Sequence, residues 1–270
     1  MAAPDSLIVE RPSSDIVVLK INRPQVRNAL NLDVRTRLAD EVTRCGADNA
    51  VRCVIVTGSE VAFAAGADIG EMAEASPVEV MSRNVQKYWR ALMDCPKPLI
   101  AAVEGFALGG GLELALCADI IVAGEGAKLG LPEVKVGILP GGGGTQKLAR
   151  LVGRHRAMLL IMTGKMFSAV EALNMGVVSE VAPTGQALAR APRICARVGR
   201  GARFASGDVD QVPRAAGRRQ VGADHPRPRE AAELLLLLRL VVRRERQPRP
   251  SWGRGLLEVG LAPSQTRSLS

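Results

Sequence analysis

The stretch from Leu99 to Ala123 decides the fold class: LIAAVEGFALGGGLELALCADIIVA. Its first five residues are apolar and predict a buried strand, which Gly105 ends. The segment Gly110–Cys117 predicts a helix, and Asp119–Ala123 predicts a further strand. A strand, a helix and a strand in this order indicate a right-handed crossover between parallel strands, which is typical of α/β folds.

The segments on either side continue this alternation. Strands are predicted at Ser14–Asn22, around the apolar run Ile16–Ile21, and at Val51–Thr57 and Val177–Val181. A helix is predicted over Asn31–Cys45, with Asn31 as its N-cap. A second helix is predicted over Pro77–Asp94, whose apolar residues recur on one face. The sequence therefore predicts an α/β fold with a largely parallel sheet.

Length and composition are those of a globular protein. The chain has 270 residues, of which 47% are hydrophobic and 23% charged, so it is not a disordered chain. No apolar stretch approaches the ~20 charge-free residues that span a bilayer, and no secretion signal is expected. The five cysteines are odd in number and lie singly in apolar runs, so we expect reduced thiols and a cytoplasmic protein.

The net charge of +9 is unevenly distributed. Up to Thr184 the chain has 7 Lys and 12 Arg against 20 acidic residues, whereas from Gly185 it has 17 Arg, no Lys and 7 acidic residues. We therefore divide it into a core, residues 1–184, and an Arg-rich region, residues 185–270. The Arg-rich region has no sustained periodicity. It is either an arm for nucleic acid or acidic lipid, or a disrupted tail such as a GC-rich gene gives when read out of frame. We expect the second.

The chain has two glycine-rich segments, Gly109–Gly111 and Gly141–Gly144, and neither matches the common phosphate-binding loops. In Gly141–Lys147 the lysine follows Gln146 and precedes Leu148, whereas a Walker loop needs Gly-Lys followed by Ser or Thr. Neither segment has the Gly-x-Gly-x-x-Gly spacing of a dinucleotide-binding fold. The chain has two histidines, so a His-based triad or metal site has little material, and no metal is expected.

Four other segments are unusual for purely structural elements: Phe63–Ile69, Gly109–Leu116, Leu129–Glu133 and Pro140–Thr145. The first has small residues where the backbone must approach another group closely. In the second, glycines open a helix whose free N–H groups can hold an anion, and Glu113 lies in its first turn. A carboxylate there is either paired, served by the helix N-terminus, or part of an active cleft.

Together and in this order, the four segments resemble the enoyl-CoA hydratase/isomerase (crotonase) family. The segments Asn22–Pro24 with Asn28–Leu30, and Phe167–Ala169 with Glu171–Ala172, match further family signatures. The resemblance covers roughly Leu7 to Pro183. It implies a crotonase-like spiral of ββα units, a coenzyme A thioester as substrate, and stabilisation of an enolate formed on that thioester.

The resemblance also implies roles for backbone groups. The N–H groups of Ala67 and Gly110 would form the oxyanion hole, because a thioester carbonyl that gains negative charge needs rigid donors in a water-poor place. The coenzyme would be bound by the following residues: Arg27, Ala65, Ala67, Asp68, Ile69 and Gly70. No metal and no redox cofactor is expected, since coenzyme A is part of the substrate.

Two glutamates distinguish the reactions of the family. By the resemblance, Glu133 donates a proton to the α carbon, Glu113 activates the water, and the Gly141 N–H helps to position that water. The presence of both carboxyl groups favours an enoyl-CoA hydratase, which adds water to a trans-2-enoyl-CoA and gives a 3-hydroxyacyl-CoA. The alternatives are an isomerase or other enolate chemistry on an acyl-CoA, nucleic-acid binding by the Arg-rich region, and an inactive protein with a disrupted C-terminal region.

The C-terminal region departs from the family pattern. Family members end in helices that close the coenzyme pocket and help to pack neighbouring subunits, and that pattern is missing from about Pro192. We therefore expect much of residues 192–270 to be poorly ordered or loosely packed. A homotrimer or a dimer of trimers is expected if the C-terminal region permits it, with no membrane or nucleic-acid partner.

Overall fold

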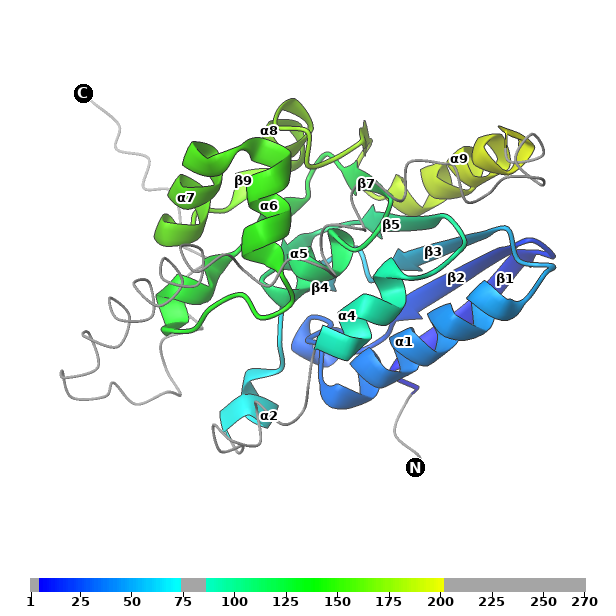
Figure 1. The fold of residues 1–270 in the computed structure, drawn as a ribbon, viewed down its shortest axis with the longest axis horizontal. Coiled ribbons are helices and arrows are strands. Elements are labelled where there is room, and N and C mark those ends of the chain that lie inside the picture. The colour runs from blue at the N-terminus through cyan, green and yellow to red at the C-terminus, as the bar shows by residue number, and fades with distance from the viewer. Residues whose placement is uncertain (1–4, 74–85, 202–270) are drawn as a thin grey trace, which may run out of the picture. The chain divides into compact units, whose positions relative to one another are not determined.

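The computed structural model describes residues 5–73 and 86–201, and all of them belong to one compact unit (Figure 1). In these described residues, ten strands form two sheets. The large sheet, in spatial order, contains β1 (Leu7–Ser13), β2 (Ile16–Ile21), β3 (Cys53–Thr57), β5 (Leu99–Val103), β7 (Ile120–Gly124) and β10 (Glu180–Ala182). The small sheet contains β4 (Ala62–Ala64), β6 (Phe106–Leu108), β8 (Lys128–Gly130) and β9 (Phe167–Ser168).

The strands alternate between the two sheets along the chain. β3, β5 and β7 each lie in the large sheet, and each is followed by a strand of the small sheet, namely β4, β6 and β8. Pairing is parallel throughout except for β1 with β2 and β8 with β9. This succession is the spiral of ββα units that the family resemblance implies, and the predicted α/β fold with a largely parallel sheet is confirmed.

The described helices are α1 (Leu32–Ala47), α2 (Ile69–Ala73), α4 (Gln86–Met93), α5 (Gly110–Ala115), α6 (Gly144–Val152), α7 (Arg154–Thr163), α8 (Ala169–Asn174) and α9 (Ala187–Gly201). Two 3-10 helices, η1 (Pro24–Val26) and η2 (Pro132–Val136), begin at prolines. Asn31 caps α1 as predicted, since its side chain accepts a hydrogen bond from the Val34 N–H. Of the helix predicted over Pro77–Asp94, residues 77–85 lie outside the described part of the chain.

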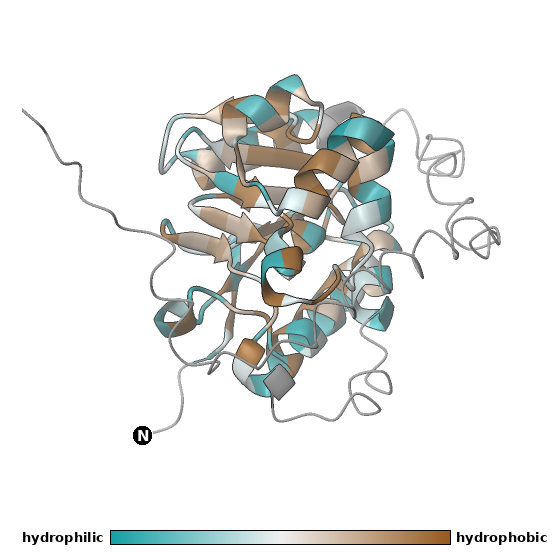
Figure 2. Ribbon diagram, turned by 90° about the vertical axis from the view of Figure 1, so that its left-hand side faces the viewer, coloured by the Kyte–Doolittle hydropathy of each residue, from teal (hydrophilic) through white to brown (hydrophobic). Residues whose placement is uncertain are grey.

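The large sheet is covered on both faces because successive side chains of a strand point to opposite sides. Val17 and Leu19 face the main core, to which α1 and α4 contribute. Ile16 and Val18 face a second cluster with α9 (Figure 1). Figure 2 shows the strands as mostly hydrophobic ribbons between helices of mixed character. The apolar runs in the sequence therefore correspond to strands buried from both sides.

Helix α9 lies beyond the proposed core, which ends at Thr184. Ala187, Ala191 and Cys195 are buried against the large sheet, and α9 continues past Pro192 to Gly201. Residues 202–270, on which most of the predicted disorder falls, lie outside the described residues. The division of the chain at Thr184 remains a prediction.

The cysteines correct one expectation. Cys53 of β3 and Cys195 of α9 form a disulfide, so the expectation of reduced thiols is wrong for this pair. The two residues are 142 positions apart in the sequence, and their spacing therefore gives no sign of the pairing. Cys45, Cys95 and Cys117 are buried and form no disulfide among the described residues.

Candidate active site

The backbone N–H groups of Ala67 and Gly110 lie close together where the small sheet meets α5. The Leu30 N–H donates to the Gly66 carbonyl over 2.8 Å, and the Asp68 N–H donates to the Leu30 carbonyl over 3.4 Å. Because Leu30 bonds to the residues on both sides of Ala67, the N–H of Ala67 itself faces the other way. Gly110 is the first residue of α5, where an N–H has no acceptor within the helix.

The two groups are close together and available to a ligand. A Cβ placed on Gly110 would lie 3.5 Å from the Ala67 nitrogen, and one placed on Gly66 would lie 3.9 Å from the Gly110 nitrogen. In residues 5–73 and 86–201, neither N–H donates to a protein acceptor. The pair can therefore hold one oxygen atom that carries negative charge.

Gly109 shapes the turn that leads into α5. Its φ of +52° lies in the region that favours glycine. A Cβ at this position would lie 3.0 Å from Glu133 Oε1. The turn thus needs glycine both for its backbone conformation and for the space that the Glu133 carboxyl occupies beside the N-terminus of α5.

Glu113 is buried in the first turn of α5, with 3% of its surface exposed. Its Oε1 accepts hydrogen bonds from the N–H groups of Gly142 and Gly144, over 2.7 and 2.8 Å. Burial raises the pKa of Glu113, while these two N–H groups and the Lys147 ammonium limit the rise. The Oε2 atom makes neither of these bonds.

Glu133 is buried in η2, with 7% of its surface exposed. Burial, and to a smaller extent the charge of Glu113, raise its pKa to about 7. Its Oε2 is buried and has no hydrogen-bond partner in the described residues. A protonated carboxyl with an unpaired oxygen is suited to donate its proton to a substrate.

The comparisons with known proteins decide the family. Residues 11–220 match the family profile described as enoyl-CoA hydratase/isomerase. The chain belongs to this family. It is 41% identical over 194 residues to 2,3-dehydroadipyl-CoA hydratase of Escherichia coli (strain K12), which covers 72% of this chain and 76% of the relative.

Other members of the enoyl-CoA hydratase/isomerase family show the same extent of similarity. Crotonyl-CoA hydratase of Syntrophomonas wolfei is 43% identical over 197 residues, or 72% of this chain and 75% of the relative. The crystal structure of an enoyl-CoA hydratase from Bacillus anthracis superposes with a TM-score of 0.69 at 37% identity, over 72% of this chain and 76% of that one.

The segment Asn22–Leu30, which carries the family signature, holds the loop Ala65–Asp68 in place. The buried Asn28 accepts from the Arg23 N–H over 2.8 Å and donates to the Ala62 carbonyl over 2.7 Å. Arg23 in turn donates to Asp68 Oδ2 over 2.8 Å. Sequence reasoning expects Asp68 to bind coenzyme, but its carboxylate is taken up by this ion pair, whose arginine holds the pKa of Asp68 down against the opposing effect of burial.

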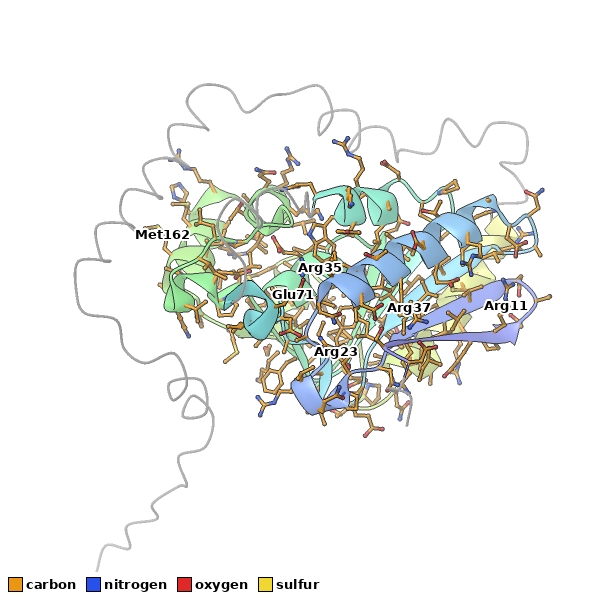
Figure 3. All side chains as sticks on the ribbon, turned by 90° about the horizontal axis from the view of Figure 1, so that it is seen from below. Arg11, Arg23, Arg35, Arg37, Glu71 and Met162 are labelled. Carbon is orange, nitrogen blue, oxygen red and sulfur yellow. A yellow bond between two sulfur atoms is a disulfide. The ribbon has the colours of Figure 1, made fainter. Side chains whose placement is uncertain are left out.

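Helix α2, which follows the loop Ala65–Asp68, makes a hydrogen bond and an ion pair to the start of α1. Glu71 accepts from the Leu32 N–H over 2.9 Å and pairs with Arg35 at 3.5 Å (Figure 3). The sequence gives no sign of this contact, because the two elements are far apart along the chain. With the Arg23–Asp68 pair it fixes the segment that directly follows Ala67.

The remaining residues predicted to bind coenzyme surround the same loop. The Ala65 N–H donates to the Arg27 carbonyl over 3.0 Å, so these two residues lie side by side. The Arg27 side chain is exposed, as are Ile69 and Gly70 at the start of α2. The structure brings all these residues to one rim, and the assignment of coenzyme contacts to them stays a prediction.

The glycine run after Pro140 makes contacts that the sequence does not predict, and the role of the Gly141 N–H in positioning water stays a prediction. Gly141, expected to position water, is exposed, and its carbonyl accepts from Gln86 Nε2 over 2.8 Å. Gly142 and Gly144 instead make the contacts to Glu113. Four successive glycines predict that the backbone approaches another group closely, but the sequence does not tell which of the four makes that contact.

No further ligand set is present in the part of the chain that the structure describes. It contains no group of three or more His, Cys, Asp or Glu side chains that could hold a metal ion. None of its helices is long and apolar enough to cross a membrane.

Proposed function

We propose that this protein is an enoyl-CoA hydratase that adds water reversibly to a trans-2-enoyl-CoA and gives a 3-hydroxyacyl-CoA. The observation that carries the proposal is the placement of two buried carboxyl groups with different surroundings around the N-terminus of α5, next to a pair of free N–H groups. The names of the relatives, which include a crotonyl-CoA hydratase, support the same reaction.

The reaction assigns one task to each group. Glu113 removes a proton from a water molecule as the water oxygen bonds to the β carbon of the enoyl chain. Electrons move to the thioester oxygen, where the N–H groups of Ala67 and Gly110 stabilise the enolate. Glu133 then gives its proton to the α carbon. One water is consumed, and proton exchange with solvent restores both carboxyl groups.

The opposite protonation states of the two carboxyl groups are supported by their surroundings. Glu113 receives two N–H groups, which stabilise its ionised form. Glu133 has a buried oxygen without a partner, which favours its protonated form. One base and one acid are what addition of water across a double bond requires, and no cofactor besides the coenzyme A of the substrate enters the scheme.

We also propose that the coenzyme binds along the rim formed by Arg27, Ala65 and Ala67–Gly70, mainly through backbone groups. The exposed Arg27 supplies a cation for a phosphate of the coenzyme. The Asp68 carboxylate shapes the loop through Arg23 and makes no direct contact in this scheme. A cytoplasmic location, where acyl-CoA thioesters are available, is part of the same proposal.

Assembly as a homotrimer or a dimer of trimers is a further part of the proposal. Large apolar side chains are exposed on neighbouring helices: Leu159 and Met162 on α7, and Val170 and Leu173 on α8, with exposed fractions of 41–60%. Exposed apolar residues that recur on adjacent helices are typical of interfaces. Met162 is labelled at the margin of the described helices in Figure 3.

A substrate comparison tests the proposed reaction. Purified protein is given crotonyl-CoA, a trans-2-enoyl thioester, and separately a trans-3-enoyl thioester, and the products are identified by mass spectrometry. We expect crotonyl-CoA to gain one water and the 3-enoyl thioester to react far more slowly. Rapid conversion of the 3-enoyl thioester to the 2-enoyl isomer, with little water addition, would instead favour an isomerase.

The alternative of nucleic-acid binding concerns the Arg-rich region, most of which lies outside the described residues. Binding to RNA through arginine would weaken steeply as salt is raised and would disappear when the region is deleted. We expect no such binding at physiological salt.

A further inference from the structure

Lys147 occupies a place behind the catalytic glutamate that none of the roles above explains. It lies in the first turn of α6, and its backbone N–H donates to the Gly143 carbonyl over 2.9 Å. Helical side chains lean toward the N-terminus of their helix, so the half-buried Lys147 side chain returns toward the glycine loop that precedes α6. It is the lysine that fails to complete a Walker motif.

The Lys147 ammonium contacts two groups that adjoin Glu113. It lies 2.9 Å from Cys117 Sγ and 3.4 Å from the Gly142 carbonyl oxygen. Cys117 lies just after the end of α5, four residues beyond Glu113, and its thiol donates to the Glu113 carbonyl over 3.2 Å. The Gly142 N–H is one of the two groups that hold the Glu113 carboxylate. The ammonium thus joins α5 to the loop that binds the base.

No other cation faces the Glu113 carboxyl from the described elements packed around it. Helix α4 presents Gln86 and Trp89, which do not titrate, and η2 presents the acidic Glu133. Cys117, just after α5, is buried, and burial raises the pKa of its thiol, so it supplies no charge. Lys147 is accordingly the positive charge that offsets the burial of Glu113.

We propose that Lys147 is a positioning residue for Glu113: its ammonium keeps this carboxyl group ionised and holds the Gly142–Gly144 loop against it. The inference rests on the proposed function, in which Glu113 is the base. Lys147 itself touches neither the substrate nor the water in this scheme. Its contribution is to keep Glu113 able to accept a proton at lower pH than burial alone would allow.

The test is the pH dependence of kcat for crotonyl-CoA hydration in Lys147→Met, Lys147→Gln and Lys147→Arg. Activity falls at low pH as Glu113 becomes protonated, and loss of a nearby positive charge raises the pKa of a carboxyl group. We expect this acidic limb to move up by about one pH unit in the Met and Gln variants. In the Arg variant it should stay near that of the wild type, and KM should change little in all three.

A second readout does not depend on activity. In protein labelled with 13C at the glutamate carboxyl carbons, the Glu113 signal is assigned by its loss in Glu113→Gln and is then titrated. Its midpoint should move with the acidic limb. Lys165→Met is the matched control, because the Lys165 side chain is 60% exposed and its ammonium pairs with Glu171 at 3.7 Å. If the wild type hydrates no enoyl-CoA, the proposed function fails, while the titration still decides the role of Lys147.

Three results would overturn the proposal. An unmoved acidic limb in a folded Lys147→Met protein would show that the charge does not act on Glu113. A raised KM with an unchanged pH profile would make Lys147 a contact of the coenzyme. Failure of both the Met and the Gln variant to fold would assign Lys147 a structural role only.

Discussion

At the scale of single residues, Glu113 and Glu133 are both buried but their surroundings treat charge differently. Glu113 is served by the N–H groups of Gly142 and Gly144 and by Lys147. Glu133 has an unpaired oxygen and Glu113 as a charged neighbour. One fold therefore gives two residues of the same type different tendencies to hold a proton, through their environments.

The raised pKa of Glu133 predicts a pH-dependent effect on stability. The folded state holds the proton with a pKa of about 7, well above the ordinary value near 4.5. The stability that this group contributes is thus present below about pH 4.5 and is lost as the pH rises through 7. Glu133→Gln cannot ionise, so at about pH 8 we expect its Tm to exceed that of the wild type by at least roughly 2–4 °C.

The difference in Tm between Glu133→Gln and the wild type should shrink at about pH 4.5, where Glu133 is largely protonated in the folded and the unfolded state. Thermal unfolding of the wild type and Glu133→Gln at both pH values measures it. Glu125→Gln, which removes an exposed carboxyl group, is the control. A Tm difference that is equal at the two pH values would show that Glu133 is not buried in the way described.

Gly142 provides a prediction about the contact that holds Glu113. A Cβ at Gly142 would lie 2.5 Å from Trp89 Nε1 and 2.9 Å from Glu113 Oε2, whereas one at Gly141 would meet nothing within 4 Å. Gly142→Ala must therefore displace the base, and we expect kcat to fall by about 100-fold. Gly141→Ala keeps its N–H and should lose far less activity. Equal kcat values in the two variants would contradict the assignment of these contacts.

At the scale of elements, helix α9 depends on a carboxyl group beneath its first turn. Glu104, between β5 and β6, is buried, and its Oε1 accepts from the Ala187 N–H over 2.9 Å. Glu104→Ala leaves this N–H without its acceptor, and we expect the free energy of unfolding to fall by about 1–3 kcal/mol. Urea denaturation measures the loss, with the exposed Glu125→Ala as a control. Equal losses in the two variants would argue against the cap.

The elements also show what the sequence can and cannot predict. Strand Ile16–Ile21 and the start of α1 at Asn31 follow from local patterns, namely an apolar run and a capping side chain. The contacts between distant elements do not. The Arg23–Asp68 pair, the Cys53–Cys195 disulfide and the burial of α9 each join residues far apart in the sequence, and no local pattern records them.

The site divides in the same way. Glycines at the start of a helix and an acid in its first turn indicate Gly110 and Glu113 as candidate site residues, because few structural roles need that combination. The family resemblance then brings in Ala67 and Glu133. The choice of Gly142 and Gly144 over Gly141, and the place of Lys147, depend on how the loop before α6 folds back on α5, which only the structure shows.

At the scale of the whole molecule, the exposed apolar side chains on α7 and α8 carry a prediction about assembly. If these helices lie at a subunit interface, Leu159→Lys and Met162→Lys place charges in an apolar contact and should separate the subunits. Light scattering coupled to size-exclusion chromatography should show three or six copies for the wild type and one copy for the double variant. A wild-type monomer, or an assembly that tolerates both lysines, would contradict the proposed interface.

The central claim is that the protein hydrates enoyl-CoA with Glu113 as the base. The most direct measurement is kcat for hydration of crotonyl-CoA by Glu113→Gln, with folding checked by circular dichroism. The account predicts a fall of about 10²- to 10⁴-fold with little change in KM. A folded Glu113→Gln protein that hydrates crotonyl-CoA at the wild-type rate would contradict it.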